Sequence, residues 1–160
     1  MVLIGITVED TVPVILIDTD MNTDIDDVTA LALILGASQD GLCQLGAVTL
    51  CSENVDGAPT AQVLLDYAAN VPGQEYLAGV PIGQYSRSSL GQAQTSNYND
   101  HIRINFSIPE TDTITNYGEP VDVLRQALVD ATGTVKIVVV GGLTNSAVAK
   151  SRRRYFRLGR

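Results

Sequence analysis

Apolar residues along the chain follow two different spacings. Three segments are almost continuously apolar and rich in β-branched side chains; they are residues 12–17, 44–51 and 134–140. Runs of this kind are typical of parallel strands that are covered on both faces. Elsewhere apolar side chains recur at helical spacing, in segments that start near Asp27, Pro59 and Val121. The alternation predicts an α/β fold with an open, mostly parallel sheet and helices on both faces.

The segments between these runs add detail to the predicted fold. Residues 76–80 predict a short strand, whereas residues 82–118 lack any sustained period and predict a long irregular stretch. The helix that begins at Asp27 is apolar nearly all round, which predicts that it is well buried. A Gly-Gly pair after the third strand predicts a turn into a helix that begins near Thr144.

The length of 160 residues and the apolar content of 45% predict one globular domain. We expect residues 13–149 to form this α/β domain, with residues 1–12 as an N-terminal extension and residues 150–160 as a basic tail. No apolar run is long enough to span a membrane, and the first ten residues have no basic segment typical of a secretory signal. Cys43 and Cys51 lie in no metal-ligand spacing, so we expect reduced core cysteines and a cytoplasmic location.

Charge is distributed unevenly along the chain. Five of the ten basic residues lie in the last ten positions, and residues 1–150 carry all 18 acidic residues against five basic ones. An acidic domain argues against nucleic acid or an anionic membrane as a partner. The tail itself fits either a basic peptide that binds nucleic acid or a chain end that does not belong to the domain.

Five aspartates lie between residues 18 and 27, where the first predicted strand ends and the first predicted helix begins; they are Asp18, Asp20, Asp24, Asp26 and Asp27. Carboxylates this close together repel one another, and a bound divalent cation would remove the repulsion. Ligands of open α/β sheets bind at the carboxyl ends of the strands, where these residues lie. A purely structural role, in which Asp24 or Asp26 caps the helix, accounts for one or two of the five.

Two known aspartate motifs fit the cluster only in part. The calcium loop of EF-hands matches Asp18, Asp20 and Asn22, but Thr23 stands where that loop needs glycine and Thr29 where it needs a bidentate glutamate. Phosphotransferases with an aspartyl nucleophile carry D-x-D-x-[TV] after a buried strand, and here Asn22 occupies the Thr/Val position. A phosphotransfer enzyme that uses Asp18 and Asp20 is therefore an alternative.

Three segments, in the expected order, resemble the inosine–uridine-preferring nucleoside hydrolase family. Residues 18–31, DTDMNTDIDDVTAL, are similar to its N-terminal signature, in the variant with two extra residues before the Asp-Asp pair. The second predicted strand leads to Asn54, as in the family, and residues 141–145 are similar to the family's G-[GP]-L-T-N turn. The resemblance covers residues 13–149 and implies hydrolysis of the N-glycosidic bond of ribonucleosides with Ca²⁺ as cofactor.

The resemblance also implies roles for individual residues. Asp20, Asp27 and the main-chain carbonyl of Thr144 would bind Ca²⁺, and Asp20 would be the catalytic base that activates water. Asp26 and Asn54 would bind the ribose hydroxyls of the small-molecule substrate. Asp18 would not bind the metal itself but would orient Asp20 or a loop amide. Asp24 lies in the two-residue extension and receives no role.

The resemblance is to the N-terminal half of the family's domain, whose second half supplies another metal-binding aspartate and further substrate contacts. We therefore expect weaker Ca²⁺ binding and little turnover, and a non-catalytic, cation-binding protein is a third hypothesis. An incompletely covered sheet would favour self-association, so a homo-oligomer is possible. His101, the single histidine, matches no motif of the family and is expected in a surface loop.

Overall fold

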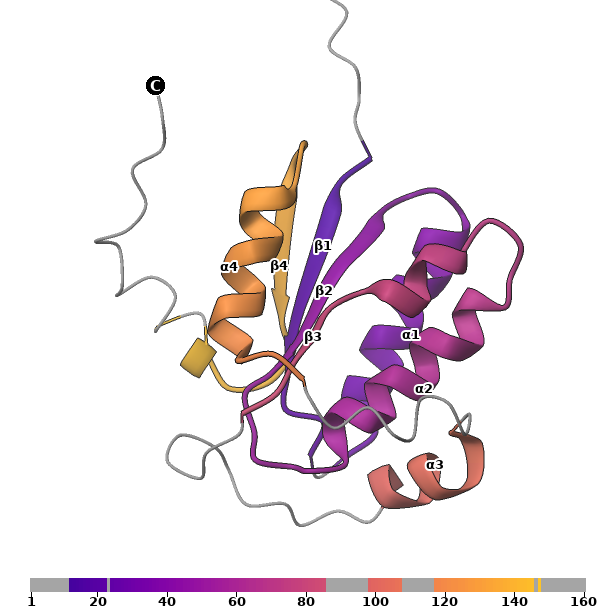
Figure 1. Ribbon diagram of the computed structural model, residues 1–160, viewed down its shortest axis with the longest axis vertical. Helices are drawn as coiled ribbons and strands as arrows, with labels where there is room; N and C mark the ends of the chain where they lie inside the picture. The colour runs from indigo at the N-terminus through magenta and orange to yellow at the C-terminus, as the bar shows by residue number, and fades with distance from the viewer. Residues whose placement is uncertain (1–11, 23, 86–97, 108–116, 146, 148–160) are drawn as a thin grey trace, which may run out of the picture.

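The computed structural model describes residues 12–22, 24–85, 98–107, 117–145 and 147 (Figure 1). The elements, in chain order, are β1 (Val14–Thr19), α1 (Asp26–Gln39), β2 (Gln44–Leu50), α2 (Gly57–Ala69), the 3₁₀ helix η1 (Glu75–Gly79), β3 (Ile82–Gly83), α3 (Tyr98–Phe106), α4 (Pro120–Asp130) and β4 (Val135–Val139). Of the predicted extension and tail, only Val12 is described.

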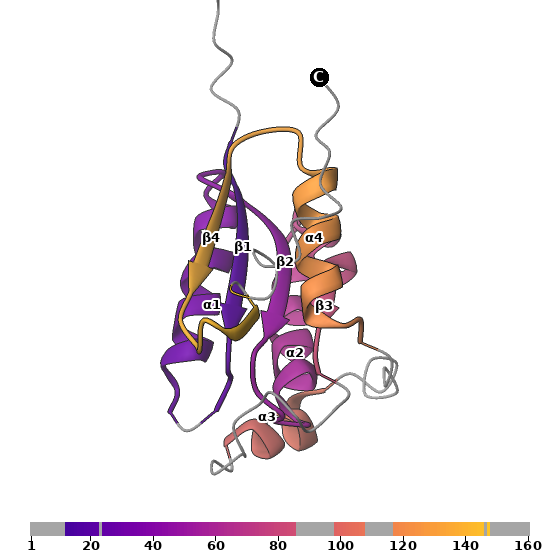
Figure 2. The ribbon, with the colours of Figure 1, turned by 90° about the vertical axis from the view of Figure 1, so that its left-hand side faces the viewer.

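The four strands form one parallel sheet in the order β3-β2-β1-β4. Helices α1 and α2 pack on one face and α4 on the other, as the two orthogonal views show (Figures 1 and 2). This arrangement confirms the predicted open parallel sheet with helices on both faces.

The core has two parts because successive side chains of β1 point to opposite faces. Ile17 packs with residues of α1 and α2, including Leu31 and Leu65. Its neighbour Leu16 packs on the other face against Leu124 of α4. Both β1 side chains are fully buried, so the first strand is the centre of the fold and fixes the direction in which its carboxyl end points.

Two predictions for the middle of the chain are wrong. Residues 76–80 were expected as a strand but lie in η1 and the residue after it, and the edge strand is β3, only two residues long. The stretch 82–118, expected to be irregular, contains β3 and α3 in its described part, while residues 86–97 and 108–116 lie outside the described residues. Helix α3 is polar and carries few strong helix formers, so its sequence gives little sign of helix, and packing against α2 supports it instead.

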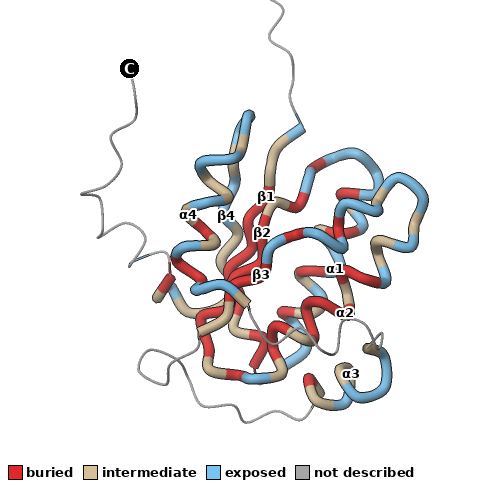
Figure 3. Tube along the Cα trace, in the orientation of Figure 1, coloured by how far each residue is buried: buried red, intermediate tan, exposed pale blue. Residues whose placement is uncertain are grey.

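Burial differs from the prediction at two elements (Figure 3). Helix α1 buries Leu31 and Leu35, but Leu33 on its outer side is 70% exposed, so α1 is not covered all round. Strand β4 was expected to be buried, yet it is an edge strand and Ile137 is 43% exposed. An apolar run identifies a strand here but does not show whether another layer covers it.

Several simpler predictions are confirmed. Helices α2 and α4 begin within two residues of the predicted positions and bury the predicted apolar residues Leu65 and Leu124. Cys43 and Cys51 are both buried and form no disulfide. His101 is exposed, although it lies on α3 and not in a loop.

In the part of the chain that the structure describes, no helix combines the length and apolar character needed to cross a bilayer.

Candidate functional site

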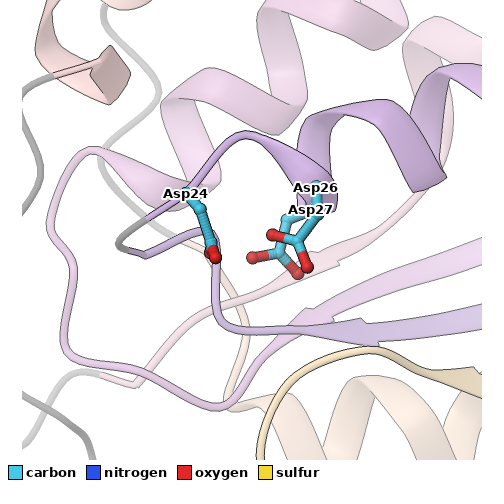
Figure 4. Close-up of side chains that lie close together, drawn as sticks. All are labelled: Asp24, Asp26 and Asp27. Carbon is cyan, nitrogen blue, oxygen red and sulfur yellow. The ribbon is translucent and has the colours of Figure 1, made fainter.

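Residues 18–27, here called the aspartate loop, join the end of β1 to the first turn of α1 at the carboxyl end of the sheet. Three carboxylates converge there: oxygen atoms of Asp24, Asp26 and Asp27 lie within 4.8 Å of one another (Figure 4). Asp26 and Asp27 occupy the first turn of α1 and follow Ile25 at the cap position. The positive end of the helix dipole therefore offsets part of their repulsion.

Asp27 is the buried member of this cluster, with 2% of its surface exposed. The hydroxyl of Thr19 donates a hydrogen bond of 2.5 Å to Asp27 Oδ1. Burial raises the pKa of Asp27 to about 6, the Thr19 hydrogen bond lowers it, and the neighbouring carboxylates of Asp20 and Asp26 raise it further. A carboxylate held among like charges is a group whose ionised form a cation would stabilise.

This pKa predicts how the stability of the cation-free protein depends on pH. The pKa of Asp27 is higher in the folded protein, about 6, than its ordinary value of 3.8. The Asp27 contribution to stability is therefore full below pH 4 and is lost as the pH rises through 6. Urea unfolding in the presence of a chelator, from pH 4 to 7.5, should show this loss in the wild type but not in Asp27→Asn. Parallel pH profiles of the two proteins would contradict the prediction.

Asp20 and Asp18 occupy different environments at the end of β1. Asp20 is half-buried, its main-chain carbonyl accepts a hydrogen bond from Ser52 Oγ at 2.5 Å, and its carboxylate is close enough to Asp27 to raise the pKa of that group. Asp18 is fully buried, and its Oδ1 accepts hydrogen bonds from Thr49 Oγ1 at 2.8 Å and Asn145 Nδ2 at 2.7 Å. Asp18 thus connects β1 to β2 and to the segment that follows β4.

The Gly141–Gly142 turn after β4 lies directly against the start of the aspartate loop. The N–H of Val140 donates to the Asp18 carbonyl at 2.9 Å, and a Cβ on Gly141 would lie 2.5 Å from the main-chain nitrogen of Asp20. Only glycine fits in such a close approach. Thr144 begins a helical turn shortly after this contact, in which the N–H of Ala147 donates to the Leu143 carbonyl. Its carbonyl remains a predicted ligand.

Cys51 lies beside the same turn and has no charge at neutral pH. The N–H of Gly142 donates to its sulfur at 3.1 Å. Burial raises the pKa of the Cys51 thiol to about 12, and the negative charge of Asp18 adds to this effect. The neutral thiol therefore fills the space between β2 and the turn.

Asn54 is buried and both ends of its amide are engaged by the protein. Its Nδ2 donates to the Met21 carbonyl at 2.5 Å, and its Oδ1 accepts the N–H of Asp56 at 3.0 Å. The predicted contact with a ribose hydroxyl stays a prediction, and in this structure the side chain holds the aspartate loop. Met21 itself has a φ of +43°, in the left-handed region that non-glycine residues rarely adopt.

Sequence reasoning missed three residues near the cluster. Asp24 was given no role, because it lies outside the aligned part of the motif, yet its carboxylate belongs to the convergent group. Asn99 of α3 donates to the Met21 carbonyl, and burial raises the phenol pKa of Tyr98, with the nearby charge of Asp27 raising it further. The one sequence feature that could have identified Asp24 was its place among five aspartates. The sequence of α3 shows no pattern that could have identified Tyr98 or Asn99.

Comparison with known proteins was made by sequence and by structure. No protein-family model matches the chain, and no curated protein matches its sequence. A solved structure described as an inosine-guanosine nucleoside hydrolase is similar, with a TM-score of 0.59 and 20% sequence identity over 88% of this chain. The chain has a nucleoside-hydrolase-like fold.

The similarity has a limited extent. The chain spans 43% of the length of that structure, less than half of it. The predicted resemblance is confirmed at the level of the nucleoside-hydrolase-like fold, whereas the narrower inosine–uridine-preferring assignment stays a prediction. The fold places the aspartate loop at the carboxyl end of a central strand, the position expected for a ligand site in a parallel sheet.

Proposed function

We propose that this chain binds Ca²⁺ at the aspartate loop and acts on the N-glycosidic bond of ribonucleosides, releasing ribose and a free base. The observation that carries the proposal is the convergence of the carboxylates of Asp24, Asp26 and Asp27 at the end of the central strand of a nucleoside-hydrolase-like fold. Fold similarity alone supports many activities, so the site has to carry the argument.

The residues present fit a hard divalent cation. Calcium is held by carboxylate, amide and main-chain oxygens, and the aspartate loop offers several of these. Asp27 is buried among negative charges, which raises its pKa, and Asn22 Oδ1 is buried in the same loop without a hydrogen-bond partner in the described residues. Asp27 would be a ligand, with Asp20, Asp24, Asp26 and the Thr144 carbonyl as the other available oxygens.

A bound Ca²⁺ would hold the ribose hydroxyls and the attacking water and would polarise that water. The chain's own residues supply orientation and proton transfer. Asp20 is half-buried beside Asp27, so its carboxylate can accept the proton of a water at the mouth of the site. Asp18, through Thr49 and Asn145, fixes the strand end from which Asp20 projects. Asp26, exposed at the start of α1, can accept a hydrogen bond from a ribose hydroxyl.

The structure does not favour phosphotransfer. That alternative needs Asp18 as a nucleophile, and a nucleophile must reach its substrate. Asp18 has no exposed surface, and its Oδ1 already accepts hydrogen bonds from Thr49 and Asn145. A non-catalytic, cation-binding protein remains the rival hypothesis, and turnover separates the two.

The proposal is tested by ribose release from inosine, guanosine and uridine, with Ca²⁺ or with a chelator. We expect slow, Ca²⁺-dependent release that falls further, by about 10²- to 10⁴-fold, in Asp20→Asn, because a general base contributes a factor of this size. Asp40→Asn is the matched control, since Asp40 is an exposed aspartate at the far end of α1. Ca²⁺ binding without any ribose release would favour the non-catalytic hypothesis, and equal rates in Asp20→Asn and the wild type would remove Asp20 from the mechanism.

A further inference from the structure

The aspartate loop contains a main-chain carbonyl that two side chains hold from different parts of the fold. Asn54, in the connection between β2 and α2, and Asn99, on α3, both donate through Nδ2 to the carbonyl oxygen of Met21 at 2.5 Å. The three residues are 0% exposed. The carbonyl of a single loop residue is thus fixed by two buried amides that are distant from it in sequence.

The residue held in this way has an unfavourable backbone conformation. Met21 has a φ of +43°, and among the described residues it is the one non-glycine residue with a positive φ. A non-glycine residue in this conformation is strained and persists only where its surroundings fix it. The N–H of Met21 donates to Thr19 Oγ1 at 3.2 Å, and the same hydroxyl donates to Asp27. The turn at Met21 is therefore linked directly to the buried carboxylate.

The side-chain amide of Asn99 acts on the loop through its N–H donor. Its Oδ1 is buried without a hydrogen-bond partner in the described part of the chain. A buried amide oxygen without a partner destabilises the fold, and an apolar side chain of similar shape would avoid this cost. The main chain of Asn99 serves a separate purpose, because its carbonyl accepts a hydrogen bond from Thr60 Oγ1 of α2 at 3.2 Å and so docks α3.

Asn99 also lies close to the carboxylates. The pKa of its neighbour Tyr98 is raised to about 12, first by burial and then by the charges of nearby carboxylates, Asp27 foremost. The first turn of α3 therefore lies beside the cluster that the Met21 turn shapes.

We infer that Asn99 is a positioning residue of the cation site: with Asn54 it clamps the Met21 carbonyl and so holds the turn that brings Asp24, Asp26 and Asp27 together. This inference rests on the proposed cation binding. It assigns α3 a purpose at the site, although no residue of α3 need touch the ion.

The test compares cation affinity in the wild type, Asn99→Ala and Asn99→Leu, measured by calorimetry with CaCl₂ alone. We expect the dissociation constant to rise by about 10- to 100-fold in both variants, as for other residues that orient metal ligands. Leucine has the same side-chain branching as asparagine and a larger volume, so the pair of leucine and alanine variants separates loss of the donor from loss of packing. Asn105→Ala is the matched control, because Asn105 is an exposed asparagine on the same helix whose hydrogen bonds, among the described residues, stay within α3.

A second measurement needs no cation. Hydrogen exchange of the main-chain amides of residues 20–27, in chelator, should become faster in Asn99→Leu and stay unchanged in Asn105→Ala. If the wild type binds no Ca²⁺, the proposed function fails, and the exchange data still decide whether Asn99 holds the loop. Unchanged exchange in Asn99→Leu, or a folded Asn99→Leu with wild-type Ca²⁺ affinity, would overturn the inference.

Discussion

Asp27→Asn should lose Ca²⁺ binding and Ca²⁺-dependent ribose release while making the cation-free protein more stable. Asparagine removes the negative charge that a bound cation needs. We therefore expect the Ca²⁺ affinity to fall by more than the roughly 10- to 100-fold that is typical for residues that only orient metal ligands. The same change removes a carboxylate that is buried beside Asp20 and Asp26 and whose pKa is raised to about 6. At neutral pH the gain in unfolding free energy is up to about 3 kcal/mol.

The opposite signs of these two effects make the experiment decisive. Calorimetry with CaCl₂ measures the first effect, and urea unfolding in chelator measures the second. Asp130→Asn, an exposed change at the far end of α4, should alter neither quantity. A variant that loses both binding and stability would show that Asp27 supports the fold and would argue against a cation site.

Gly141→Ala should destabilise the protein strongly, whereas Gly142→Ala should be tolerated. A Cβ on Gly141 would lie 2.5 Å from the Asp20 nitrogen, 2.7 Å from Cys51 Sγ and 2.8 Å from the Thr19 carbonyl carbon. Two of these neighbours are backbone atoms of the central strand end and cannot move away alone. We expect the loss of unfolding free energy to reach or exceed the roughly 1–3 kcal/mol typical of overpacking.

The neighbouring glycine provides the control. A Cβ on Gly142 would meet its nearest neighbours at 3.6 and 3.7 Å, which is ordinary van der Waals contact. Thermal unfolding of the two variants, side by side, measures the difference. Equal melting temperatures would mean that Gly141 does not lie in close contact with the backbone of Thr19 and Asp20.

The part of the fold that could be predicted from sequence is the part with strong local patterns. β1 is a continuous apolar run because both of its faces are covered, and the aspartates that follow it stand out against that run. β3 could not be found in the same way, since two residues are too few to show a period. The exposure of Ile137 and Leu33 depends on which surfaces other layers cover, and the pattern of a single element carries no such information.

The candidate site was predictable to a similar degree. A motif located the aspartate loop and Asp27, and the structure places this loop at the carboxyl end of β1. Asp24 belongs to the cluster and follows the left-handed residue Met21, a conformation that the sequence does not indicate. Asn99 reaches the loop from 78 residues away, through a helix that has no clear sequence signal.

The pairing of β1 with both β2 and β4 sets the order in which the site can form during synthesis. Asp18 receives its hydrogen bond from Asn145, 127 residues later in the chain. At ribosomal rates, roughly 6–25 s separate the appearance of these two residues. Meanwhile, the central strand lacks one neighbour, and its carboxylates lack the turn at Gly141. Contacts between residues far apart in sequence form slowly, so the aspartate loop should be among the last parts of the domain to become ordered.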